Sequence, residues 1–166
     1  MKLLLLLFSL ILLPFSGYTQ EKEYHKFEIG ISGGLSIIED DPALSYGINA
    51  RYLIRMRNEK LLLPELSFDR SQIRRHYMPG TTYNVMLFTL GYRRGNEKFF
   101  WQPQLGGGIG REDGSKFLDA FFHIGMETGL IFGRKLLGFR YRFGSTGDLI
   151  FGESFHQFTF VHSLSL

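Results

Sequence analysis

Acidic and basic side chains alternate with apolar residues along several stretches of this 166-residue chain. Carboxylates that face guanidinium groups could carry out acid–base catalysis, but they can also neutralise one another as structural ion pairs. If these stretches are β-strands, nine charges share the polar faces: Glu28, Glu65, Asp69, Asp119 and Glu127 with Arg51, Arg55, Arg140 and Arg142. Five acids against four bases are nearly balanced. Eight strands would leave an interior just wide enough for side chains to fill, which favours structural ion pairs over catalysis. We predict a structural interior network that contains Glu28, Arg51, Glu65, Glu127, Arg140 and Arg142.

Two pairs within this network are predicted to face each other across tight hairpins. If the turn between their strands is centred on 133–134, Glu127 lies directly opposite Arg140. If the first short link is centred on Asn58, the same counting places Arg51 opposite Glu65. Opposed residues of antiparallel strands have Cβ atoms about 4.5–5.5 Å apart. Each pair can therefore form a charge-assisted hydrogen bond.

A histidine beside a serine is the second candidate for chemistry. His162 and Ser163 could act as base and nucleophile. Neighbouring residues of a strand point to opposite faces, however, so these two side chains cannot meet directly. The glycine run at 105–110 (LGGGIG) lacks the spacing of a dinucleotide-binding loop, and the five histidines lack the spacing of metal ligands. We predict no catalytic, cofactor-binding or metal-binding residue.

The elements that position these residues are predicted to be β-strands, because apolar residues recur with period two. Phenylalanine (17) and tyrosine (8) favour strands, and the mean hydropathy of −0.04 is expected when apolar and polar positions cancel. Eight alternating stretches are present. Only 81–94 (TTYNVMLFTLGYRR) is ambiguous, and there we assign Met86, Phe88, Leu90 and Tyr92 to the apolar face.

The links between the eight predicted strands alternate in length. Short links lie near 57–60, 94–97 and 133–134, and longer links lie at 37–44, 70–81, 111–116 and 145–154. The tripeptide Asn-Glu-Lys occurs in the first two short links. Long loops at one end, short turns at the other and alternating strands of about ten residues are typical of a transmembrane β-barrel. In hydrocarbon such a sheet must close, because an open edge leaves backbone groups unpaired.

Residues 1–19 are predicted to be a secretory signal peptide. Lys2 precedes an apolar run from Leu3 to Leu13, which is too short to span a bilayer as a helix. The chain contains no cysteine, so we expect neither a disulfide nor a lipid attached to cysteine. Residues 20–166 are predicted to form one barrel domain.

With these features the chain resembles the small eight-stranded outer-membrane barrels of the OmpA membrane-domain and OmpX type, including the PorT-like families. The resemblance also rests on FEIGISGGLS at the start and FTFVHSLSL at the end. It implies an all-β fold, an eight-stranded antiparallel up-and-down transmembrane β-barrel in the outer membrane of a Gram-negative cell. The chain departs from the pattern at Leu166, where such barrels often end on an aromatic residue. Pro64 and Pro103 are a second departure, and we predict a bulge at each.

Two alternatives stay open. A soluble secreted ligand-binding barrel would use the same strands with the apolar faces inward. A barrel-embedded lipid-modifying enzyme, similar to the lipid A deacylases, would use His162 and Ser163. Glycine-rich polar faces suit a narrow interior that side chains fill, which favours the membrane barrel. We therefore expect a structural or interaction protein with a plugged lumen rather than an open porin.

The basic residues indicate what the barrel could contact. The second long loop carries Arg70, Arg74 and Arg75, which could face the phosphates of lipopolysaccharide. Cations of the short links, among them Arg93 and Arg94, could meet anionic headgroups of the other leaflet. We expect a monomeric barrel that contacts outer-membrane lipids and an envelope protein, with no cofactor and no nucleic-acid partner.

Overall fold

The structure is a computed structural model that describes residues 27–38, 41–56, 60–73, 81–96, 98–116, 118–146 and 153–166. The strands are β1 (Phe27–Ile38), β2 (Asp41–Tyr52), β3 (Ile54–Arg55), β4 (Leu61–Ile73), β5 (Thr81–Gly95), β6 (Phe99–Glu112), β7 (Asp119–Phe132), β8 (Lys135–Thr146) and β9 (Glu153–Ser165). No helix among the described residues is long and apolar enough to cross a membrane. The signal peptide expected over 1–19 lies outside the described residues.

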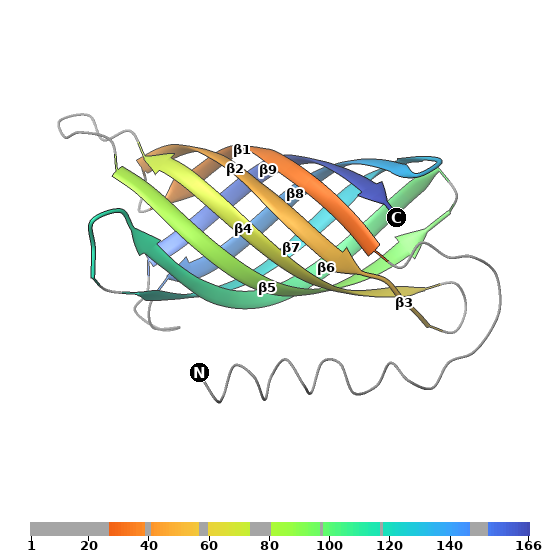
Figure 1. Ribbon diagram of the computed structural model, residues 1–166, viewed down its shortest axis with the longest axis horizontal. Helices are drawn as coiled ribbons and strands as arrows, with labels where there is room; N and C mark the ends of the chain where they lie inside the picture. Colours follow the sequence, from red (N-terminus) through yellow and green to blue (C-terminus); the bar gives the residue numbers. More distant parts are fainter. Residues whose placement is uncertain are drawn as a thin grey trace.

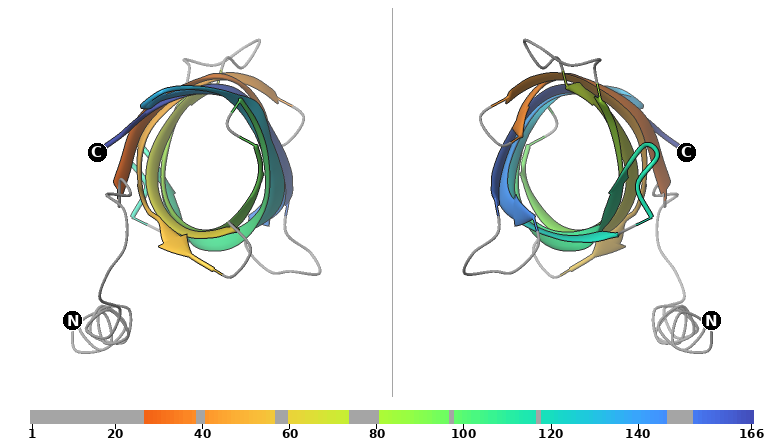
Figure 2. Two further views of the ribbon diagram at one scale, coloured as in Figure 1. Left: turned by 90° about the vertical axis from the view of Figure 1, so that its right-hand side faces the viewer. Right: turned by 90° about the vertical axis from the view of Figure 1, so that its left-hand side faces the viewer.

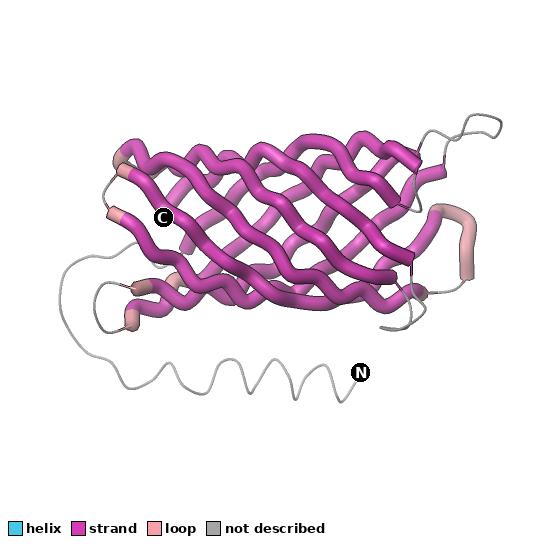
Figure 3. Tube along the Cα trace, turned by 180° about the vertical axis from the view of Figure 1, so that it is seen from behind, coloured by secondary structure: helices cyan, strands magenta, loops and turns pink. Residues whose placement is uncertain are grey.

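The strands form a closed barrel of eight strands. β2 and β3 are two parts of one strand, because both pair with β4 in the same antiparallel register. β1 pairs with β2 and with β9, and β2 pairs with β4, so the sheet closes on itself. Figure 1 shows the strands running obliquely along the barrel, Figure 2 shows the ring from either end, and Figure 3 shows the barrel from behind. The predicted eight-stranded antiparallel up-and-down barrel is confirmed.

Side chains alternate between the outer wall and the interior. On β1 the exposed fraction is 55% for Ile29 and 61% for Ile31, whereas it is 1% for Glu28. The predicted facing of β5 is confirmed, since Phe88 is exposed and Thr89 is fully buried. Large apolar side chains face outward on every long strand, as contact with lipid requires. This arrangement contradicts the soluble alternative, in which the apolar faces would point inward.

The apolar outer wall has polar boundaries. Lys60, which directly precedes β4, and Arg70, which lies on β4, both occupy outward-facing positions and are ten residues apart. Between them the outward-facing residues are Leu62, Pro64, Leu66 and Phe68. With a rise of about 3.3 Å per residue and a tilt of about 40°, ten residues cover about 25 Å along the membrane normal. That height matches the hydrocarbon-facing band of an outer-membrane barrel.

Pro64 and Pro103 interrupt the sheet without a bulge, so our prediction of bulges is wrong. The pairing is missing opposite each proline, at Tyr52 of β2 and at Tyr92 of β5. The register is identical on both sides of each gap, which means that no extra residue is inserted. Proline has no N–H to donate, and the ladder loses a bond locally while the strand keeps its path.

Local sequence explains two of the short turns. The side-chain oxygen of Asn96, in the repeated tripeptide, accepts hydrogen bonds from the backbone N–H groups of Lys98 (2.9 Å) and Phe99 (2.8 Å). Gly133 has a φ of 60°, a conformation that glycine adopts without strain, and forms the predicted two-residue turn with Arg134. Asn58, in the other copy of the tripeptide, lies outside the described residues.

The long link predicted at 37–44 is wrong. β1 continues to Ile38 and β2 begins at Asp41, and these two residues are paired. Ile38 and Ala43 are buried inside the barrel. Side chains therefore keep alternating between the interior and the outer wall past the predicted strand ends. The buried apolar residues stabilise this extension of the hairpin.

Candidate functional site in the barrel interior

Four charged residues form a closed ring of ion pairs inside the barrel. Arg51 donates from Nε to Glu65 and from Nη2 to Glu127, each at 2.5 Å. Arg140 donates from both terminal nitrogens to Glu65, each at 2.9 Å, and from Nε to Glu127 at 2.8 Å. Each arginine thus touches both carboxylates, and each carboxylate touches both arginines. All four side chains are about 1% exposed.

Two further ion pairs extend the ring in opposite directions. Glu28 lies 3.3 Å from Arg51 and 2.9 Å from Arg93 Nη2. On the other side, Arg142 bonds Glu65 and Asp69, each at 2.7 Å. We call these eight residues the charge layer: Glu28, Arg51, Glu65, Asp69, Arg93, Glu127, Arg140 and Arg142. With four arginines and four carboxylates, its formal net charge is zero.

The charge layer joins walls of the barrel that lie opposite each other. β4 and β8 are four strands apart in either direction around the closed sheet, and Glu65 of β4 binds Arg140 and Arg142 of β8. β2 and β7 are related in the same way, and Arg51 binds Glu127 between them. Contacts between opposite walls cross the lumen, so these side chains occupy its middle.

Buried apolar side chains lie on both sides of the charge layer. Near the long loops they form what we call the loop-end cluster, with Ile38, Ala43, Tyr83, Val85, Leu87, Phe121 and Phe155. Phe121 meets Tyr83 and Phe155 edge to face, with ring centroids 5.6 and 5.7 Å apart. Toward the short turns, Leu63, Phe100 and Leu136 are buried. The guanidinium of Arg93 stacks over the Phe100 ring at 4.7 Å, which links the charges to these apolar residues.

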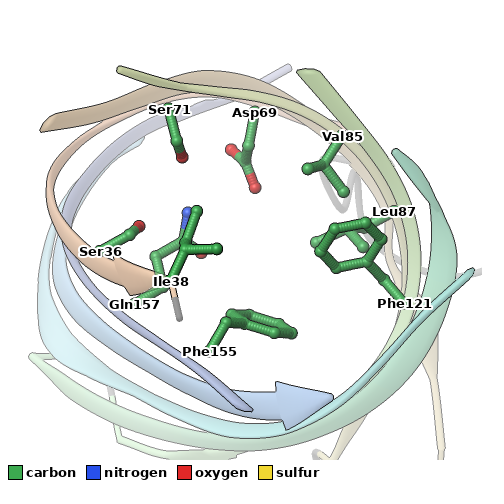
Figure 4. Close-up of a pocket in the computed structure, with 9 residues that line it drawn as sticks. All are labelled: Ser36, Ile38, Asp69, Ser71, Val85, Leu87, Phe121, Phe155 and Gln157. Carbon is green, nitrogen blue, oxygen red and sulfur yellow. The ribbon is translucent and has the colours of Figure 1, made fainter. Parts of the chain in front are cut away.

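A small cavity lies where the charge layer meets the loop-end cluster. Asp69 and Gln157 line it on the polar side, and Leu87 and Phe155 are among its apolar residues. Figure 4 shows these side chains pointing from several strands into the space. Its volume, the space open to the centre of a water-sized sphere, is about 20 Å³. This volume holds one water molecule and no organic ligand.

Small residues provide the room that the charge layer needs. Gly47 pairs with Asp69 across β2 and β4, and a Cβ atom at Gly47 would overlap the Asp69 carboxylate. On β7, a Cβ atom at Gly125 would lie 3.2 Å from Cγ of Arg142. The glycine-rich faces are therefore a consequence of crowding in the interior, as expected for a narrow barrel.

All six residues predicted for the interior network lie in the charge layer. The predicted hairpin pairs are confirmed, because Glu127 is paired with Arg140 and Arg51 with Glu65. Arg55, which we expected in the interior, is exposed next to the first short turn. Arg93 was placed in a short link by the sequence analysis, but it is only 5% exposed and belongs to the charge layer. Thr89, Gly91 and Arg93 occupy alternate positions of one strand and so share its inward face, and this spacing indicates that Arg93 lies in the interior.

The predicted lipopolysaccharide-facing residues are only partly described. Arg70 lies at the loop end of the outer wall, 3.3 Å from Asp113, and both side chains are about half exposed. Asn84 donates to the same carboxylate at 2.7 Å. Arg74 and Arg75 lie outside the described residues.

The candidates for catalysis do not come together. His162 is exposed on the outer wall, whereas Ser163 is 2% exposed in the interior. The wall of the barrel separates them, as the alternation of a strand requires. Among the described residues, no group of three or more His, Asp or Glu side chains could hold a metal ion.

Comparisons with known proteins identify the fold. No protein-family model matches the sequence, and no curated protein sequence matches it. The chain is similar to the solved structure of the outer membrane enzyme PagL, with 10% identity, 84% of this chain and 99% of that chain covered, and a TM-score of 0.57. It is similar to Neisserial surface protein A (NspA), with 12% identity, coverage of 84% and 96%, and a TM-score of 0.61. For Ail, the attachment invasion locus protein of Yersinia pestis, the identity is 13%, the coverage 84% and 95%, and the TM-score 0.50.

These identities are low, and the likeness shows the fold alone. The fold is that of the small eight-stranded outer-membrane barrels, as the sequence predicted. Together with the outward-facing apolar band, it supports a location in the outer membrane.

Proposed function

We propose that this protein is an integral outer-membrane barrel with a closed lumen and a structural or interaction role. The observation that carries the proposal is the charge layer, whose ion pairs cross the lumen between β4 and β8 and between β2 and β7. An eight-stranded barrel leaves an interior that side chains can fill. Here the buried ion pairs of the charge layer fill its middle, and apolar residues lie on either side of them. An ion that entered would have to displace these pairs.

The interior also argues against catalysis by its charged groups. Glu65 and Glu127 each bind at least two guanidinium groups and are 1% exposed. A general acid or base must come within hydrogen-bond reach of its substrate. The space that the described residues leave beside Asp69 holds one water molecule, which is too small for a substrate of this carboxylate.

A lipid-modifying role through His162 and Ser163 is disfavoured by their separation across the wall. We expect a Ser163→Ala protein to leave the acylation of lipid A unchanged, as measured by mass spectrometry of lipid A from expressing cells. Loss of a deacylation that the unchanged protein performs would overturn this part of the proposal. The control is His162→Ala, which changes only the outward-facing member of the pair.

Interactions would then take place at the outer wall and the loops. Arg70 and Asp113 lie at the loop end, where phosphate groups of lipopolysaccharide reach the barrel, and Arg pairs well with phosphate. We expect Arg70→Gln to lower lipopolysaccharide binding to the monomeric barrel in detergent, and Asp113→Asn to raise it. Equal binding by both variants would remove this contact from the proposal. An envelope protein partner of the loops stays a prediction.

The first experiment for the proposal is membrane fractionation combined with gel mobility. We expect the protein in the outer-membrane fraction, with different mobility in heated and unheated samples because a folded barrel resists detergent. Recovery in the soluble fraction, with the same mobility in both samples, would contradict a membrane barrel.

A further inference from the structure

The two ends of the barrel differ in charge. The three short turns and their flanking residues (54–60, 94–98 and 133–135) contain seven cations and two acids. The links and flanking residues at the other end (37–44, 70–81, 111–116 and 145–154) contain five cations and seven acids. The short-turn end is thus basic, and the loop end is slightly acidic.

Three of the basic residues lie on the outer wall rather than in the turns. Lys60, Arg94 and Lys135 occupy outward-facing positions where β4 begins, where β5 ends and where β8 begins. Arg94 and Lys135 are exposed, and Lys60 is half-buried. Arg55, Lys98 and Arg134 lie nearby in sequence and are also exposed. We call these six residues the basic rim.

Each outward-facing cation of the basic rim has an aromatic neighbour on the adjacent strand. The ammonium of Lys60 lies 6.0 Å from the ring centroid of Tyr92. Arg94 is paired with Trp101 across β5 and β6. Lys135 is paired with Phe132 across the β7–β8 turn.

Cations beside aromatic rings at the edge of an apolar band are typical of a membrane interface. Aromatic rings flank the apolar band of outer-membrane barrels at both boundaries. Lys60 marks the edge of the band, about 25 Å from Arg70 at the opposite edge by strand rise and tilt. The cations are therefore at the height of lipid headgroups, whose phosphates attract them within a Debye length of about 10 Å at 0.1 M salt.

We propose that the basic rim is a binding surface for anionic phospholipids, of the phosphatidylglycerol class, in the leaflet at the short-turn end. The ligand groups are the headgroup phosphates, held by Lys60, Arg94 and Lys135 and by the three cations next to them. A lipid fits better than an acidic soluble protein, because the three wall cations adjoin the lipid-facing band and lie beside aromatic rings. The proposal rests on the barrel spanning a membrane, and its test separates the two claims.

The test is electron spin resonance of the full barrel in phosphatidylcholine bilayers that contain spin-labelled phosphatidylglycerol or spin-labelled phosphatidylcholine. A membrane barrel immobilises a shell of lipid whichever label is used. The basic rim predicts a several-fold preference of this shell for phosphatidylglycerol. In about 1 M salt, where the Debye length is about 3 Å, the preference should largely disappear.

Three variants locate the effect. A Lys60→Gln, Arg94→Gln, Lys135→Gln protein should lose most of the preference, and folding is checked by its heat-dependent gel mobility. The matched control, Arg70→Gln with Arg111→Gln and Lys116→Gln, removes three cations from the loop end and should keep the preference. Lys60→Arg with Lys135→Arg retains the charge and should also keep it.

Three results would overturn the inference. They are an immobilised shell without preference for phosphatidylglycerol, a preference that high salt leaves intact, and an equal loss in the loop-end control. The first is also the result expected if the rim binds an acidic protein instead. Absence of any immobilised shell would instead contradict the membrane location, which the proposed function states.

Discussion

The loop-end cluster and the charge layer fill neighbouring parts of the same lumen by different means. The loop-end cluster consists of seven buried apolar side chains, of which Tyr83 also donates a hydrogen bond from its hydroxyl to Asp119. Dispersion and burial have little directional preference, so similar side chains can replace one another. In the charge layer each guanidinium has carboxylate partners on particular strands. The charge layer therefore requires particular residues at particular strand positions, whereas the loop-end cluster tolerates the exchange of one apolar side chain for a similar one.

The strongest test of this difference is the removal of Glu65. This carboxylate binds Arg51, Arg140 and Arg142. We expect Glu65→Leu to lower the free energy of unfolding by about 3–5 kcal/mol, because it leaves buried guanidinium groups short of a partner. The measurement is urea unfolding of the barrel in lipid vesicles. As a control on the same strand, Leu66→Val changes a side chain that faces lipid and should cost little; a similar cost for both would contradict the role assigned to Glu65.

A double-mutant cycle at Glu127 and Arg140 comes next. Either change to Leu alone should cost about 3–5 kcal/mol, because it leaves a buried charge without its partner. The double change leaves three arginines and three carboxylates that still pair through Arg51, Glu65 and Arg142. We therefore expect the double variant to be more stable than the sum of the single effects predicts, with a coupling of about 0.5–3 kcal/mol. Simple additivity in urea unfolding would show that the two residues do not interact.

The loop-end cluster should give the smallest effect. Phe121→Leu exchanges one buried apolar side chain for another, and we expect a cost below about 1.5 kcal/mol. The same measurement on Glu65→Gln, which keeps the shape of the side chain but removes its charge, should show a clearly larger loss. If Phe121→Leu cost as much as Glu65→Gln, the two regions would not differ in the way proposed.

Contacts between strands that are neighbours in sequence could be predicted, because they need only alternation and a turn. Glu127 and Arg140 are joined by a two-residue turn, and their pairing follows by counting from it. Contacts across the lumen, such as Arg51 with Glu127, depend on how the closed sheet brings opposite walls together. Nothing local in the sequence encodes that distance.

Errors of the sequence analysis concentrate where strands end. Arg93 lies two positions before the end of β5, and its assignment to the short link missed its position on the inward face. Ile38 and Ala43 likewise extend β1 and β2 into a stretch with three consecutive acids, which indicated a long loop. In both cases tertiary contacts inside the barrel decide the strand end, and local composition does not.

The central claim is that paired side chains close the lumen, and single-channel recording in planar bilayers tests it most directly. The folded protein is reconstituted at low density, and an open porin in the same membrane serves as the positive control. We predict no large, stable conductance steps, because the charge layer and the apolar residues on either side of it occupy the interior. Large, stable steps from the unchanged protein would contradict the account.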